Sequence, residues 1–190
     1  MQRGFTLVEL LIVIAILAVL SVTVVVVLNP AELLKQARDS TRISDLASIN
    51  SAIALYLTDI ASPGIGGIND TACSARLGRL TAGGTSPFLA GMTPTVDSTT
   101  EVDGNAWVTV DLANITGGSP LSRMPLDPVN STTYFYGYAC GNNSQPLQYE
   151  LDANMESTKY AAGGTSDVEG NSKDGGDNAT IYETGNNLAQ

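Results

Sequence analysis

A run of 19 uncharged residues near the N-terminus, from Leu10 to Leu28, constrains this chain more than any other feature. As an α-helix the run would span about 28 Å, at about 1.5 Å per residue, which is close to the roughly 30 Å hydrocarbon core of a bilayer. It is longer than the apolar core of a typical cleaved signal peptide, and its bulky far end offers no small-residue cleavage site. The run therefore predicts a retained membrane helix.

The composition of the 190-residue chain removes several classes of function. There is no histidine, which excludes His-dependent catalytic triads, His-metal sites and His proton shuttles. The 9 basic and 19 acidic residues give a net charge of −10, which makes the chain a poor general ligand for nucleic acid backbones. The only two cysteines lie far apart and cannot form a CxxC redox motif or a four-cysteine zinc site. We therefore expect neither an enzyme nor a nucleic-acid partner.

One acidic residue, Glu9, stands directly before the apolar run. A carboxylate at membrane depth costs at least about 2.5 kcal/mol and is normally paired or functional. Either Glu9 lies in the headgroup region, because it follows Gly4 so closely, or it needs a positive partner. Arg3 is one candidate, and the free amine of Phe5 would be a second if the chain were cut after Gly4.

The segment Gly4–Leu11, which reads GFTLVELL and leads into the apolar helix, resembles the processing motif of type IV pilins and type II secretion pseudopilins. The resemblance implies that a prepilin peptidase cuts after Gly4 and that the new N-terminal residue, Phe5, is methylated. It also implies that Glu9 neutralises the amine of a neighbouring subunit during assembly. The implied product is a homo-oligomeric helical filament, which a membrane assembly machinery builds and which requires no cofactor.

On this resemblance we expect a structural subunit of a type IV pilus-like filament. A major pseudopilin of a type II secretion system is the alternative, and a minor tip or adhesin subunit is less favoured. The head would lie outside the cytoplasmic membrane before assembly, and in an extracellular or periplasmic filament afterwards. Positive-inside counting disagrees, because Lys35, Arg38 and Arg42 follow the helix whereas only Arg3 precedes it.

The expected fold is α+β, with a long N-terminal helix whose second half packs on a small antiparallel sheet with long loops. Asn29 and Pro30 are typical of a helix start, or of a kink in one continuous helix. Apolar residues spaced three or four apart then predict one buried stripe: Leu46, Ile49, Ile53, Leu57 and Ile60. Four segments follow: a leader at 1–4, a transmembrane or filament-core helix at 5–28, an amphipathic helix at 29–60 and a head at 61–190.

Alternating side chains in the second half of the head predict three strands: 107–112, 133–140 and 147–152. The turn at 141–144 would join the last two as a hairpin. The stretch 61–105 is expected to be mostly loop, with one short helix near 75–80.

Three tyrosines, Tyr134, Tyr136 and Tyr138, share one face of the second expected strand. A tyrosine stripe is typical of a platform that stacks sugars or bases, or of a sheet face packed on a helix. The acidic charge of the chain favours packing on the helix.

Cys73 and Cys140 should form a disulfide if the head lies outside the cytoplasm, as the resemblance implies. In the chain-entropy model, closing a loop of this length stabilises the head by about 4 kcal/mol. Two unrelated buried thiols are the alternative.

The stretch 163–178 is rich in glycine and acidic residues. Calcium prefers roughly six to eight oxygen ligands, often on a flexible loop. The stretch offers these candidate ligands: Asp167, Glu169, Asn171, Asp174 and Asp177. Major pseudopilins carry a calcium-binding loop in the corresponding region, although this sequence lacks their usual pattern there. The spacing does not follow the EF-hand pattern, and a solvated loop without metal is the alternative.

Overall fold

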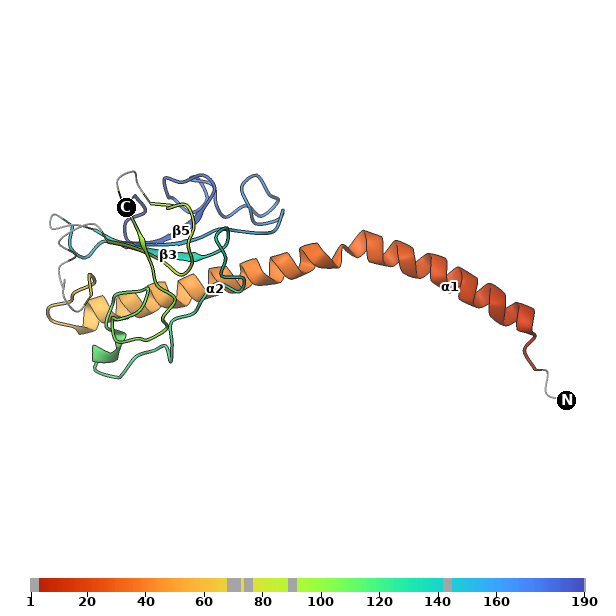
Figure 1. Ribbon diagram of the computed structural model, residues 1–190, viewed down its shortest axis with the longest axis horizontal. Helices are drawn as coiled ribbons and strands as arrows, with labels where there is room; N and C mark the ends of the chain where they lie inside the picture. The colour runs from red at the N-terminus through yellow and green to blue at the C-terminus, as the bar shows by residue number, and fades with distance from the viewer. Residues whose placement is uncertain (1–3, 68–72, 74–76, 89–91, 142–144, 190) are drawn as a thin grey trace. The chain divides into compact units, whose positions relative to one another are not determined.

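The computed structural model describes residues 4–67, 73, 77–88, 92–141 and 145–189. The chain divides into two compact units, Met1–Lys35 and Gln36–Gln190 (Figure 1). The first contains helix α1 (Leu7–Leu28) and the beginning of helix α2 (Pro30–Asp59). The second contains the rest of α2 and a five-stranded sheet, so the α+β fold class is confirmed.

Asn29 separates the two helices. Its backbone is left-handed, with φ 40° and ψ 71°, a conformation that asparagine tolerates better than most residues. Pro30 follows with no N–H to donate, and the Asn29 carbonyl accepts the N–H groups of Glu32 and Leu33 at 3.0 and 3.3 Å. The same residue therefore ends α1 and provides the first acceptor of α2, which excludes an uninterrupted helix at this point.

One side of α2 forms the centre of the main core. Leu46, Ile49 and Ile53 are completely buried, and Leu57 and Ile60 pack partly buried against the same cluster. This confirms the apolar stripe, because its three-and-four spacing keeps every member on one side of the helix. Buried apolar residues of the strands and loops pack in the same cluster as this side of α2.

The sheet has the strand order β2–β1–β3–β4–β5. The strands are β1 (Leu77–Leu80), β2 (Thr95–Val96), β3 (Tyr136–Cys140), β4 (Tyr149–Ala153) and β5 (Tyr182–Gly185). All neighbours are antiparallel except β1 and β2, which are parallel. The sheet is therefore mixed, which corrects the prediction of a purely antiparallel sheet. The parallel pair arises because β2 returns after a long connection instead of a tight turn.

The two faces of β3 bury different groups. Tyr136 and Tyr138 face the main core, where their hydroxyls donate to Asp45 on α2 (2.8 Å) and to the Ile65 carbonyl (2.7 Å). On the other face Phe135 and Ala139 join a smaller core with Leu80, Phe88 and Met92. The tyrosine stripe thus packs against the helix side of the sheet, as predicted, and these two rings are not available for stacking on a ligand.

The β3–β4 pair confirms the two later strand predictions with small shifts in their limits. β4 begins at Tyr149 rather than at Leu147, whose side chain is 37% exposed. Next to the strands, the Gly141 N–H donates to the Gln148 carbonyl at 2.7 Å. Residues 142–144 of the expected turn lie outside the described part of the chain.

The predicted strand at 107–112 is wrong. The segment forms no strand, and the 3-10 helix η1 (Leu112–Asn114) begins at its end. The segment is buried on both sides, because three of its side chains are completely buried: Trp107, Val108 and Val110. The alternation of apolar and polar residues therefore does not mark one buried face here. Trp107 donates from its indole N–H to the Pro125 carbonyl at 3.1 Å, instead of standing beside a partner strand.

The predicted short helix near 75–80 is also wrong where the structure describes it. Residues 75 and 76 lie outside the described part, and Leu77–Leu80 is strand β1, with Gly78 opposite Ala139 of β3. Pairing with β3 overrides the weak local preference of this four-residue segment. The Cys73–Cys140 disulfide, which confirms the predicted bond, ties the start of this segment to the end of β3.

A buried ion-pair network joins α2 to the loops of the head. The Arg42 guanidinium contacts Asp39 one turn away (2.7 Å) and Asp127 (2.6 Å), and all three side chains are completely buried. Arg38 pairs with Glu156 at 2.6 Å. Two of the three basic residues that follow α1, Arg38 and Arg42, are therefore paired with acidic residues of the head.

Candidate functional site: the N-terminal segment and helix α1

Gly4 and Phe5 lie in a non-helical segment directly before α1. Phe5 is 86% exposed, and no described atom lies within 4 Å of the position that a Cβ at Gly4 would occupy. The fold itself therefore does not require a glycine at position 4. The peptide bond between these residues is accessible from outside.

Thr6 and Glu9 form a reciprocal capping box at the start of α1. The Glu9 N–H donates to the Thr6 hydroxyl oxygen (3.2 Å), and the Thr6 N–H donates to Glu9 Oε2 (2.8 Å). The Thr6 hydroxyl also donates to Oε2, at 2.7 Å. The box holds the carboxylate beside the first turn, where the helix dipole favours negative charge. Sequence reasoning missed Thr6, although the spacing T-x-x-E is a known signal of this cap.

The surface of α1 is apolar on all sides and exposed. Its large apolar residues include Leu10, Ile14 and Leu17, each more than half exposed. The helix is long and apolar enough to span a membrane. Its two hydroxyls are satisfied internally, because Ser21 donates to the Leu17 carbonyl (2.7 Å) and Thr23 to the Leu20 carbonyl (2.8 Å). Such a surface is stable only in lipid or against other apolar helices.

Comparison with known proteins identifies this segment. Residues 1–25 match the prokaryotic N-terminal methylation motif. The chain has a pilin-type N-terminus. The motif is the signal of type IV pilins and pseudopilins, and Gly4, Phe5 and Glu9 all fall within it. It covers 25 of the 190 residues, and neither a curated protein nor a solved structure matches the chain.

Among the described residues, no three of the acidic candidates of the loop at 163–178 bring ligand oxygens within 4.8 Å of one another. Asp167 accepts the backbone N–H groups of Gly163, Glu169 and Gly170 at 2.9–3.1 Å, and these hydrogen bonds, with that from Gly163 the strongest, lower the pKa of Asp167. Glu169 accepts the N–H groups of Met155 (2.6 Å) and Ala162 (2.8 Å), while burial raises its pKa.

The remaining members of this set are Asn171, Asp174 and Asp177. Asp174 accepts the N–H groups of Gly176 (3.0 Å) and Glu183 (3.1 Å). Asp167, Glu169 and Asp174 therefore act mainly as acceptors that fold the loop backbone. Calcium at this loop stays a prediction.

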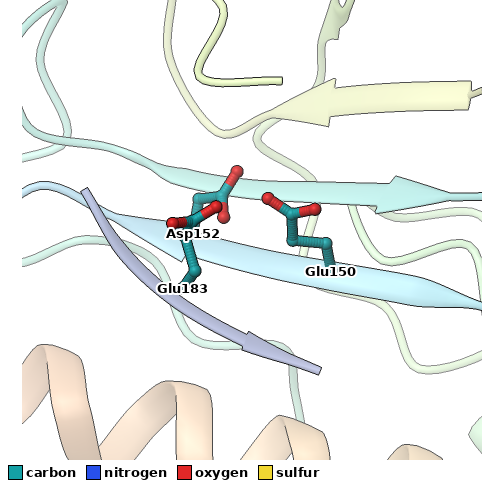
Figure 2. A group of neighbouring side chains, drawn as sticks. All are labelled: Glu150, Asp152 and Glu183. Carbon is teal, nitrogen blue, oxygen red and sulfur yellow. The ribbon is translucent and has the colours of Figure 1, made fainter. Parts of the chain in front are cut away.

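In the described chain, the group of three acidic side chains close enough to share a metal ion lies elsewhere. It consists of Glu150 and Asp152 of β4 and Glu183 of β5 (Figure 2). Sequence reasoning missed this group because β5 was not recognised as a strand. The alternation that placed Leu151 in the core was the available signal, since it directs both of its neighbours to the opposite face.

Proposed function

We propose that the chain is a structural, non-enzymatic subunit of a type IV pilus-like filament. Prepilin peptidase cleaves the bond between Gly4 and Phe5, Phe5 is methylated, and α1 passes from the membrane into the filament core. The observation that carries the proposal is an exposed and almost entirely apolar helix whose first turn holds a carboxylate in a fixed position, inside a methylation motif. The motif supports both processing and assembly, because the residues proposed for the two steps, Gly4, Phe5 and Glu9, all lie within it.

Charge balance gives Glu9 its role in docking. Cleavage after Gly4 creates one amine, on Phe5, beside the one acidic residue of the apolar helix. A carboxylate in lipid costs at least about 2.5 kcal/mol, and pairing it with the amine of an adjoining subunit removes much of that cost. The box uses Oε2 of Glu9, so Oε1 is available to the incoming amine. The box needs no residue before Thr6, and it therefore survives the cut.

The head pairs two of the basic residues that positive-inside counting sets against an external head. Positive-inside counting takes an excess of Lys and Arg within about 15–20 residues of a membrane helix as the mark of the cytoplasmic side. Arg42 is buried between Asp39 and Asp127, and Arg38 is paired with Glu156. In the folded chain, two of the three counted residues are therefore paired with acids.

Electron microscopy of cells that express wild type, Glu9→Ala and Glu9→Gln tests the proposal. Alanine removes both the charge and half of the capping box, whereas glutamine can still accept the Thr6 N–H and lacks only the charge. We expect filaments that contain this chain in wild type and few or none in either variant. Normal filaments with Glu9→Gln and none with Glu9→Ala would show that the cap, not the charge, matters, and would contradict the docking mechanism.

A further inference from the structure

Three carboxylates are buried together on the face of the sheet opposite α2. Tyr149 and Leu151 point into the main core beside α2, and the alternation of β4 sends Glu150 and Asp152 to the other side. Glu183 of β5 joins them there, and Figure 2 shows the three side chains on the same side of the strands. None is more than 2% exposed. One ligand oxygen from each side chain lies within 4.8 Å of the others.

The arrangement is unfavourable for a protein without a bound counter-charge. Asp152 and Glu183 stand directly opposite each other in the β4–β5 register, where like charges repel. Both oxygens of Asp152 and Oε1 of Glu183 are buried with no hydrogen-bond partner among the described residues. Burying unpaired charge costs several kcal/mol per ion. Burial, followed by the nearby Glu150, raises the pKa of Asp152 well above its usual range, and burial also raises that of Glu183 to about 8.

The surroundings hold the three side chains in place. Asn178 donates its N–H to Glu183 Oε2 at 3.0 Å, and a Cβ at Gly176 would overlap the Glu183 carboxylate, so the loop before β5 packs tightly on this side chain. On β3, a Cβ at Gly137 would lie 3.4 Å from Asp152 Oδ2 and 3.0 Å from the Phe88 ring. The Phe88 ring and the close backbone at Gly176 therefore limit the positions that the Asp152 and Glu183 side chains can take.

We propose that Glu150, Asp152 and Glu183 form a calcium-binding site between β4 and β5. Two oxygens that each lie about 2.4 Å from one calcium ion are at most about 4.8 Å apart, and the ligand oxygens of this group all lie within 4.8 Å of one another. Magnesium demands near-ideal octahedral geometry and usually keeps several waters, whereas calcium accepts several carboxylates in a flexible geometry, so three buried carboxylates favour calcium. Zinc prefers nitrogen and sulfur ligands, whereas this chain has no histidine and both of its cysteines are in the disulfide. The site shares no ligand with the loop candidates, but it adjoins two of them, because Asp174 accepts the Glu183 N–H at 3.1 Å and Asp177 adds to the effect of burial on the pKa of Asp152. The site does not depend on filament assembly.

Calorimetric titration of the full chain in detergent with calcium chloride at pH 7.5, after treatment with EDTA, tests the site. We expect one calcium per chain and a rise in melting temperature of at least about 4 °C at saturating calcium. Asp152→Asn and Glu183→Gln should each lose at least about tenfold in calcium affinity. Asp167→Asn, in the loop at 163–178, is the matched control and should bind calcium like wild type.

The variants also separate a lost ligand from a lost fold. Because Asp152→Asn removes one of two opposed charges, its melting temperature in EDTA should equal or exceed that of wild type. If wild type released or absorbed no heat of binding when titrated with calcium, the proposal would be overturned, and the result would indicate that the carboxylates share protons instead. Calcium binding that persists in both Asp152→Asn and Glu183→Gln, or that is lost only in Asp167→Asn, would also overturn it.

Discussion

Arg42 is a completely buried cation held between two buried carboxylates, Asp39 and Asp127. Replacing it with methionine keeps much of the side-chain volume but leaves both acids without their counter-charge. We expect Arg42→Met to lower the free energy of unfolding by about 3–5 kcal/mol. Urea unfolding followed by the fluorescence of Trp107, the single tryptophan, measures this loss.

Arg38→Met is the matched control for that experiment. The Arg38 side chain is 32% exposed and pairs with Glu156 near the surface, so its loss should cost about 1 kcal/mol or less. Equal losses in the two variants would show that burial does not set the strength of this network.

Two adjacent glycines give a second test at the level of single residues. A Cβ at Gly84 would overlap the Phe135 ring and lie 2.7 Å from the Thr132 carbonyl oxygen, whereas a Cβ at Gly83 meets no described atom within 4 Å. We expect Gly84→Ala to destabilise the head by about 1–3 kcal/mol, because Phe135 is buried and cannot move freely. Gly83→Ala should change stability by less than about 1 kcal/mol. Thermal unfolding of both variants compares them directly, and similar melting temperatures would contradict the packing described for Phe135.

Strands β3 and β4 bring three buried tyrosines to the helix side of the sheet. Burial raises the pKa of Tyr136, Tyr138 and Tyr149, for Tyr149 to about 12. In the unfolded chain these phenols ionise near pH 10, so above that pH the folded state binds more protons than the unfolded state. The free energy of unfolding must therefore fall as the pH rises from about 10 through 12.

Absorbance of tyrosinate near 295 nm, recorded alongside unfolding, tests this dependence on pH. We expect the buried tyrosines to ionise together with unfolding and Tyr149→Phe to reduce the loss of stability. Full ionisation of all seven tyrosines near pH 10 in a folded head would contradict their burial.

The elements that could be predicted from the sequence are those whose pattern is regular and one-sided. The stripe of α2 and the alternation in β3 and β4 each place apolar side chains on a single face, and the structure confirms them. β1 and β5 could not be predicted in this way, because LGRL and YETG are short, contain glycine and gain their form from pairing with β3 and β4. The segment at 107–112 gave a false strand because it is buried on both sides.

At the scale of the whole molecule, the two candidate sites differ in how far apart their residues lie in the chain. Gly4, Phe5 and Glu9 fall within six residues, so a local motif is enough to find them. The carboxylates of β4 and β5 are brought together only by the register of two strands separated by a long loop. The acidic composition of that loop made it the predicted calcium site, but acids such as Asp167 and Asp174 accept hydrogen bonds from backbone N–H groups.

The central claim is that the acid at the start of α1 is neutralised by an adjoining copy of the same chain. A cryo-electron microscopy reconstruction of native filaments at side-chain resolution measures this contact directly. We predict subunits that begin at a methylated Phe5, with α1 in the filament core and the Glu9 carboxylate within about 4 Å of the Phe5 nitrogen of a neighbour. A filament in which Glu9 faces solvent, or in which the subunit retains Met1, would contradict it.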